Sequence, residues 1–339
     1  MEEEKKLYPL KFCPLQDNYA WGSAVWRLAD LGWRDSFVLE GWLASNTVSE
    51  VMDTYMERVT GDPVFEYWGR QFPVCLKHIK VSGRMPLQVH PDDSLSAERY
   101  DFLGKEKIWY VLRAGRDAAL LLGWKRDTDA SEVMQACADG SEEDLMNCVA
   151  PHAGQFFRIE PGTVHAAQGD LEILEIAESS PLDFCVSPRS QELSEDEFDP
   201  ALDLTEALDF IDYKAFKPAP DTSGKPSGGV ERLVSIPQME VCRIDLSGAM
   251  NIHMEKFGAF ILYHCLQGSA SVQMQVLGQT ASFPLKEGET MLVPAECPDY
   301  ILVPASPATR LLEITVPPRE DHDPYINPAA SPEPEDGEI

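Results

Sequence analysis

The feature that most constrains the fold of this chain is a pair of strand-rich blocks that resemble each other. An apolar strand followed by a glycine turn occurs at Ile108–Leu112 and again at Phe260–His264. A turn containing proline precedes a second apolar strand at Leu171–Ile176 and again at Leu311–Ile314. Short strands at regular spacing, in two weakly similar copies, predict two β-sandwich or jelly-roll barrels.

Breaks in the strand pattern predict where these domains begin and end. Ser131–Ala138 and Ser141–Asn147 each start with a serine that can cap a helix, so a small helical insert is expected within the first copy. Proline, serine, glycine and lysine dominate Pro218–Gly229, which is typical of a linker. The expected order is an N-terminal domain over 1–200 with the insert near 128–150, a helix and linker over 201–231, a C-terminal domain over 232–318, and a disordered acidic tail over 319–339.

Charge and composition exclude several kinds of partner. The 339 residues, enough for roughly two average domains, carry a formal charge of −29, so we expect repulsion from nucleic acid and from anionic lipid. A locally basic pocket for a phosphorylated substrate remains compatible with that total. There is no apolar run of 18 or more residues and no secretory signal, and the eight cysteines form no CxxC pair. A cytoplasmic protein with reduced thiols is therefore expected.

Two histidines and a glutamine suggest a metal site in the first copy. Gln88 and His90 lie two residues apart on an expected strand, so their side chains share a face. His165 follows a Pro-Gly turn that can swing its strand across a barrel. Two neutral imidazoles with an oxygen donor suit zinc or a similar divalent ion, although either histidine could instead be a hydrogen-bonded structural residue. The second copy has Cys297 where the first has His165, so metal chemistry is expected only in the first.

Longer motifs around these residues resemble a known family. Gln88–Asp93 (QVHPDD) resembles the signature of the type I mannose-6-phosphate isomerases, in the cupin superfamily. Gly104-Lys105 with Trp109-Tyr110 resembles that family's G-K-x-E-x-W-Y strand, and Pro161–Ala166 resembles its PxGTxHA segment. Further likenesses in order along residues 7–317 occur at Glu142–Asn147, Ala207–Asp212, Pro284–Glu289 and Val293–Ala295. The chain is thus identified as similar to a divergent member of this family.

The resemblance implies a fold, a reaction and a site. The fold would be all-β, with two cupin (jelly-roll β-barrel) domains and a small helical insert. The reaction would be the metal-dependent aldose–ketose interconversion of mannose 6-phosphate and fructose 6-phosphate, in a monomer or homodimer. One Zn²⁺ per chain would be bound by Gln88, His90 and His165. Lys77 and Lys105 match family lysines that would act as electrostatic or acid/base groups.

Two departures from the family pattern fall on expected site residues. The family's remaining ligand is the glutamate of G-K-x-E, but Lys107 stands at that position and Glu106 lies one place earlier. A one-residue shift flips a side chain on a regular strand, whereas a bulge would turn Glu106 inward as the fourth metal ligand. Cys185 stands at the position of the family's catalytic arginine. Arg189, four residues on, is the candidate replacement if the loop is rebuilt, and is otherwise a surface residue.

Three hypotheses follow from this mixture. The chain is an active mannose-6-phosphate isomerase with rearranged ligands, an isomerase of the same fold acting on another sugar or sugar phosphate, or a non-catalytic sugar-binding or regulatory cupin without metal. Gln88, His90 and His165 favour the first two hypotheses. Lys107 and Cys185 favour the third, because an ammonium repels a divalent ion and a thiol does not replace a guanidinium.

Overall fold

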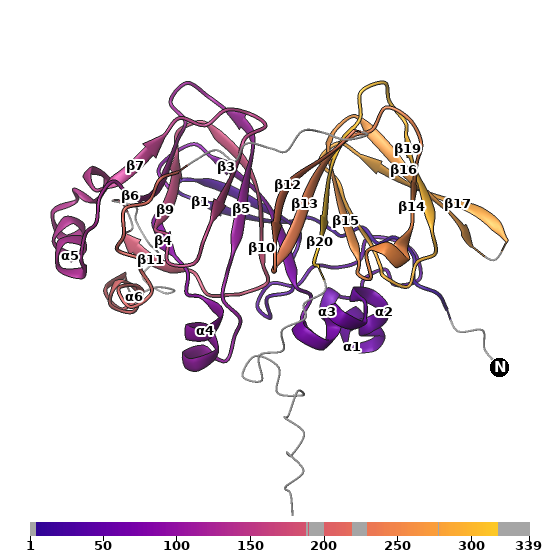
Figure 1. The fold of residues 1–339 in the computed structure, drawn as a ribbon, viewed down its shortest axis with the longest axis horizontal. Helices are drawn as coiled ribbons and strands as arrows, with labels where there is room; N and C mark the ends of the chain where they lie inside the picture. The colour runs from indigo at the N-terminus through magenta and orange to yellow at the C-terminus, as the bar shows by residue number, and fades with distance from the viewer. Residues whose placement is uncertain (1–4, 188, 190–199, 219–228, 277, 318–339) are drawn as a thin grey trace, which may run out of the picture. The chain divides into compact units, whose positions relative to one another are not determined.

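The computed structural model describes residues 5–187, 189, 200–218, 229–276 and 278–317, which form parts of two compact units (Figure 1). The histidine unit comprises the described parts of Cys13–Ser36 and Val74–Ser223. The carboxy-terminal unit comprises the described parts of Met1–Phe12, Phe37–Pro73 and Gly224–Ile339. The expected N-terminal domain over 1–200 is therefore divided, because the residues from Phe37 to Pro73 pack with the second block of strands. The expected tail over 319–339 lies outside the described residues, as does most of the expected linker.

Two antiparallel sheets build the histidine unit. The six-stranded sheet has, in spatial order, β1 (Leu15–Tyr19), β2 (Gly22–Leu28), β3 (Val74–Val81), β10 (Leu171–Glu178), β5 (Lys107–Ala114) and β8 (Phe156–Ile159). The five-stranded sheet has β11 (Phe184–Ser187), β4 (Leu87–Val89), β9 (His165–Gln168), β6 (Ala119–Trp124) and β7 (Met146–Val149). Three helices accompany these sheets: α4 (Asp93–Tyr100), α5 (Ala130–Asp139) and α6 (Pro200–Ala207).

Two further sheets build the carboxy-terminal unit. One has β12 (Val230–Ile236), β13 (Met239–Asp245), β20 (Arg310–Thr315), β15 (Ile261–Gln267) and β18 (Thr290–Val293). The other has β14 (Met250–Ile252), β19 (Tyr300–Pro304), β16 (Ser269–Val276) and β17 (Gln279–Lys286). Its helical segments are α1 (Val48–Tyr55), α2 (Glu57–Thr60), α3 (Asp62–Trp68) and the 3₁₀ turn η2 (Met254–Lys256). The mostly β fold class expected from the sequence is thus confirmed.

The helical insert is only half as helical as its sequence suggests. The helix expected over Ser131–Ala138 is confirmed as α5, capped by the Asp129 side chain. The helix expected over Ser141–Asn147 is wrong, because only the 3₁₀ turn η1 (Glu142–Asp144) forms before β7 pairs with β6. The Asn147 amide donates to the carbonyl oxygens of Leu122 and Trp124, which holds this segment extended. Pairing with a buried strand here overrides the local helix signal.

Each unit has its own apolar core. In the histidine unit, the core contains aromatic and aliphatic side chains from both sheets, including Trp109, Phe157 and Leu122. In the carboxy-terminal unit, Tyr263, Val272 and Leu311 belong to a separate core. Among the described residues, helices are too short or too polar for any of them to traverse a lipid bilayer.

Candidate active site

Three neighbouring strands of the six-stranded sheet place charged side chains on one buried face. Glu175 on β10 lies opposite Lys77 on β3 and opposite Trp109 on β5. Because partners in an antiparallel ladder share a face, and alternate residues on one strand do too, Lys107 joins the same face. The sequence therefore brings two lysines and a glutamate together without any help from loops.

Glu175 is the inner anion of this face. Its carboxylate lies 2.7 Å from the Lys77 ammonium and 3.4 Å from the Lys107 ammonium, and it accepts a 2.7 Å hydrogen bond from the Trp109 indole. Burial by itself would raise the pKa of Glu175, but Lys107 and Lys77 outweigh burial and lower it. Burial would likewise lower the pKa of Lys77, but Glu175 and Asp183 outweigh that effect and raise it. Glu175 is therefore an ionised carboxylate held in place by the two lysines.

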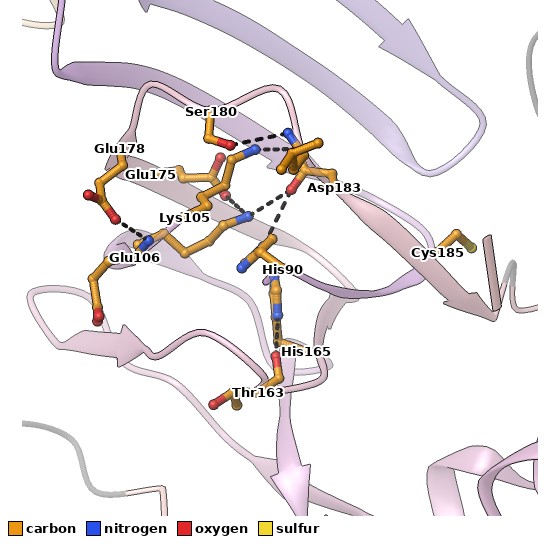
Figure 2. A network of polar contacts seen from close by, with 12 residues as sticks. His90, Lys105, Glu106, Thr163, His165, Glu175, Glu178, Ser180, Asp183 and Cys185 are labelled. Atoms are coloured by element: carbon orange, nitrogen blue, oxygen red, sulfur yellow. Dashed lines mark hydrogen bonds and ion pairs between the residues drawn. The ribbon is translucent and has the colours of Figure 1, made fainter. Parts of the chain in front are cut away.

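Asp183 is the outer anion, and it precedes β11 in a loop. Its carboxylate lies 2.7 Å from the Lys105 ammonium, 3.5 Å from the Lys107 ammonium and 3.4 Å from His90 Nε2 (Figure 2). The Asp183 side chain is 32% exposed, whereas that of Lys107 is 1% exposed. Solvent therefore reaches this cluster at Asp183. Burial alone would raise the pKa of Asp183, but Lys105 and Lys107 lower it well below its usual range.

The buried Lys107 ammonium needs both carboxylates. An attraction across 3.4–3.5 Å is worth about 5 kcal/mol at an effective dielectric constant of about 20. Removing an ammonium from water costs several kcal/mol, so one such contact is about break-even and two hold the charge in place. The attraction to Asp183 is the weaker of the two, because that carboxylate is partly in contact with water.

His90 and His165 do come together, as the sequence predicts. Their ring centres are 4.6 Å apart, and both side chains are buried. His165 Nδ1 donates to the Thr163 carbonyl oxygen at 2.9 Å, because a carbonyl can only accept. His165 Nε2 therefore carries the lone pair. Within the described parts of the chain, this nitrogen and both ring nitrogens of His90 are buried without a hydrogen-bond partner.

Both imidazoles are neutral at pH 7. Burial first, and then the Lys107 ammonium, lowers the pKa of His165 to about 3 and that of His90 well below its usual range. Gln88 is the ladder partner of His165 across β4 and β9, so the two side chains lie on the same face, with Gln88 half-buried. The three expected ligands are thus near neighbours.

Two glycines set the turns that deliver these side chains. Gly162, with φ of 80°, donates its N–H to the His90 carbonyl, and a Cβ there would lie 2.9 Å from the Phe210 carbonyl oxygen. Gly104 lies against the Asp92 backbone, where a Cβ would meet a backbone carbon at 2.5 Å. The first turn leads into His165 and the second leads into Lys105. A side chain at either position would displace a site residue.

Two expected site residues lie elsewhere. Glu106 alternates with Lys105 and Lys107, so its carboxylate points away from His90 (Figure 2). It pairs with Arg158 at 2.7 Å. The strand is regular here, and the bulge that would turn Glu106 inward does not form. Arg189 is buried against Glu143 and donates to the Met85 carbonyl at 2.9 Å, so it is a structural residue and not part of the lysine cluster.

Cys185, which stands at the position of the family's arginine, carries no charge. Burial raises the pKa of the Cys185 thiol to about 12, and its backbone N–H donates to Asp203. Neither Cys185 nor Arg189 therefore supplies the cation that the family resemblance leads us to expect. Lysines supply the positive charge instead.

The cluster has a net positive charge within a strongly acidic chain. The ammonium groups of Lys77, Lys105 and Lys107 face the carboxylates of Glu175 and Asp183, and the imidazoles are neutral. The net charge is therefore +1. Sequence reasoning missed Asp183, although lysines that share one face with a single glutamate require a further carboxylate nearby. That requirement was the available signal for Asp183.

Known proteins resemble this chain in sequence. No family model matches the chain. The mannose-6-phosphate isomerase of Streptococcus mutans is 27% identical over 234 residues, which are 66% of this chain and 68% of that protein. The mannose-6-phosphate isomerase ManA of Bacillus subtilis is 23% identical over 310 residues, or 84% of this chain and 93% of that protein. This chain is similar in sequence to the mannose-6-phosphate isomerases.

Solved structures of this family share the fold. The crystal structure of the Bacillus subtilis mannose 6-phosphate isomerase superimposes with a TM-score of 0.77 at 19% identity, covering 91% of this chain and 100% of that one. A putative mannosephosphate isomerase from Archaeoglobus fulgidus gives a TM-score of 0.73 at 17% identity, covering 94% of this chain and 100% of that one. The likeness in fold therefore extends over most of the chain.

The residues present do not fit the zinc ion that the family resemblance implies. The unpartnered imidazole nitrogens of His90 and His165 would suit a metal ion. The remaining expected carboxylate, Glu106, is bonded to Arg158, and the Lys107 ammonium stands in the cluster instead. Among the described residues, no three His, Cys, Asp or Glu side chains are placed to hold a metal together. An ammonium has three donors and no lone pair, so it cannot serve as a ligand.

Proposed function

We propose that this protein interconverts the aldose and ketose forms of a hexose 6-phosphate, with mannose 6-phosphate and fructose 6-phosphate as substrates. The observation that carries the proposal is the buried cluster of three lysines and two carboxylates beside His90, open to solvent at Asp183. Its net positive charge suits a phosphorylated sugar, which the acidic remainder of the chain would repel. The named relatives support the choice of sugar.

The reaction requires a proton to move between C1 and C2 through an enediol. A base removes the proton from C2 while the carbonyl oxygen at C1 is protonated, and the reverse transfers at O2 and C1 complete the ketose. No oxidant or reductant is consumed. The residues must therefore supply a proton acceptor, a proton donor and a positive charge beside the developing oxyanion.

Asp183 and Lys105 are the proposed proton-transfer pair. They are joined at 2.7 Å, and Asp183 is the most exposed of the charged cluster residues. Burial lowers the pKa of Lys105, against the opposing effect of Asp183, which moves this ammonium toward the range where it can donate a proton near neutral pH. Lys77 and Lys107 are held by Glu175 and remain as fixed charges.

Each unit is proposed to be a cupin jelly roll, and zinc is left out of this proposal. The two pairs of antiparallel sheets support the jelly-roll assignment. Lys107 and the outward-facing Glu106 argue against a bound divalent ion, as described above. All eight cysteines are free, which supports the proposal of a cytoplasmic location.

The second candidate is a non-catalytic sugar-phosphate-binding protein of the same fold. It is favoured by Cys185, a neutral thiol at the position where the family resemblance implies a catalytic arginine. An isomerase acting on a different sugar phosphate is a third. Binding without turnover would support the second candidate, and turnover of another sugar phosphate alone would support the third.

The test is a coupled assay of fructose 6-phosphate formation from mannose 6-phosphate, with other aldose 6-phosphates and free mannose in parallel. Turnover of mannose 6-phosphate and little turnover of free mannose are expected. Lys77→Met should abolish most of it, and the matched control is Lys80→Met, since Lys80 lies on the same strand with a side chain 56% exposed. If calorimetry shows that mannose 6-phosphate binds but the assay detects no product, the isomerase proposal is contradicted and the non-catalytic binding protein remains.

A further inference from the structure

Lys107 differs from the other two lysines of the cluster in how deeply it is placed. Its side chain is 1% exposed, compared with 16% for Lys77 and 6% for Lys105. The ammonium lies 3.4 Å from Glu175 Oε2 and 3.5 Å from Asp183 Oδ1, so it bridges the inner and outer anions. It is the only cation among the described residues that forms ion pairs with both of these carboxylates.

This ammonium also lies at the edge of the histidine pair. Asp183 Oδ1, which Lys107 approaches, is 3.4 Å from His90 Nε2. The Glu175 and Asp183 carboxylates, the His90 imidazole and the Lys107 ammonium therefore lie close together beside the end of β4 and the start of β5.

We propose that the Lys107 ammonium is the resident cation of this site and takes the place of a divalent metal ion. This inference rests on the proposed function, because it assigns the ammonium the role of binding and stabilising the sugar oxygens that become negative in the enediolate. The ammonium has three N–H donors, and two of its neighbours are carboxylates, so it can offer a donor to a substrate oxygen without leaving them. The ammonium excludes a divalent ion in two ways: it fills the position that the ion would take, and its positive charge repels the ion.

The charge balance agrees with this exchange. At this position the family resemblance implies a glutamate that holds a divalent ion, and glutamate with such an ion carries a total of +1. Lys107 alone also carries +1, so the field felt by a substrate is similar with one residue changed. The positions of the expected metal ligands agree with this exchange. Among the described residues, His90 and His165 have buried imidazole nitrogens without a hydrogen-bond partner, and the Glu106 carboxylate is bonded to Arg158.

Metal content separates this proposal from a metalloenzyme without depending on turnover. Purified wild-type protein, dialysed against Zn²⁺ and then against buffer, should hold less than about 0.1 Zn²⁺ per chain, and added Co²⁺ should show no ligand-field absorption of a bound ion. Lys107→Glu should acquire about one Zn²⁺ per chain and the Co²⁺ spectrum, because Gln88, His90 and His165 then regain a carboxylate partner. Lys80→Glu, on the exposed side of β3, is the matched control and should gain none.

Turnover supplies the second measurement. Lys107→Met should lower kcat about 10²–10³-fold with a smaller effect on KM, and a chelator should leave wild-type turnover unchanged. Wild-type protein that binds about one Zn²⁺ and loses it on His90→Ala would overturn the proposal, as would a folded Lys107→Glu that binds no metal. If Lys107→Glu does not fold, the wild-type metal analysis and Lys107→Met decide. One further outcome separates the two proposals. If the wild type is metal-free and Lys107→Glu binds Zn²⁺, but the wild type shows no turnover, the isomerase function is refuted and the replacement of the metal ion by Lys107 stands.

Discussion

Equivalent positions in the two units carry a buried glutamate, but the surroundings differ. Glu175 on β10 and Glu313 on β20 each lie opposite an aromatic residue of the neighbouring strand, Trp109 and Tyr263 respectively. Each accepts a hydrogen bond from that aromatic residue, at 2.7 Å and 2.9 Å. The other ladder partner is Lys77 for Glu175 and Cys242 for Glu313. One carboxylate therefore faces cations and the other faces a thiol and a tyrosine.

This difference shifts the pKa of the same side chain in opposite directions in the two units. Lysines lower the pKa of Glu175 despite burial, whereas burial raises the pKa of Glu313 to about 7. Tyr263 also bonds to the Tyr300 hydroxyl at 2.9 Å, which completes a polar network without a cation. The fold thus provides the same buried position twice, and only the histidine unit fills it with the charges that acid/base chemistry on an anion needs.

The largest expected effect is on stability, when the Glu175 carboxylate is removed and compared with removal of the Glu313 carboxylate. Glu175→Gln leaves Lys77 and Lys107 without their inner counter-charge, so the free energy of unfolding should fall by about 3–5 kcal/mol. Glu313→Gln should cost about 1 kcal/mol or less at pH 6, because the glutamine resembles the protonated acid that is already present. Urea unfolding of both variants measures this. Equal losses would contradict the comparison.

Removing the proposed proton donor tests the histidine unit by activity. Lys105→Met should lower kcat for mannose 6-phosphate about 10²-fold, since the loss of general acid/base catalysis is of that order. The Lys80→Met control should retain wild-type kcat, and a thermal melt checks that both variants are folded. A wild-type kcat for Lys105→Met would remove this lysine from the proposed proton-transfer pair.

The pH dependence of stability should differ in sign between the two glutamates. Because the folded pKa of Glu313 is raised from 4.5 to about 7, its contribution to stability is complete below pH 4.5 and is lost as the pH rises to about 7. The loss should reach about 3 kcal/mol relative to Glu313→Gln. Glu175, with a lowered pKa, stabilises the fold above pH 4.5 and loses that contribution in acid. Unfolding curves from pH 4 to pH 8 that show no difference between wild type and Glu313→Gln would contradict the Glu313 environment.

The smallest effect is expected at Glu106. Because its carboxylate pairs with Arg158 on the far side of β5, Glu106→Gln should leave kcat/KM and metal content unchanged within about twofold. Steady-state kinetics with metal analysis measure both quantities. A large loss of activity together with loss of a bound ion would show that Glu106 reaches the site after all.

Local sequence patterns predicted the parts of the site that depend on strand alternation. The two-residue spacing of Gln88 and His90, and the Pro-Gly turn before His165, were sufficient to place those side chains near one another. Asp183 could not be placed in this way, because it lies in a loop whose path depends on contacts with Lys105 and Lys107. The packing of Phe37–Pro73 with the carboxy-terminal unit is likewise non-local and leaves no periodic signal.

Alternation also resolved the ambiguity that the sequence left at Glu106. Both a regular strand and a bulge were compatible with Gly104–Lys107 in sequence, and only the ion pair with Arg158 shows which one forms. For Ser141–Asn147, local capping signals favoured a helix, but the strand partner β6 decided the outcome. Where a tertiary partner competes with a local preference, the sequence of one segment is insufficient.

The most direct test of the account follows the sugar itself. The ¹H NMR spectrum of mannose 6-phosphate in buffered D₂O is recorded over time with wild-type protein that has been treated with a chelator. The account predicts that signals of the aldose decline as those of fructose 6-phosphate grow, and that Lys105→Met slows this conversion while Lys80→Met does not. An unchanged mannose 6-phosphate spectrum with folded wild-type protein would contradict it.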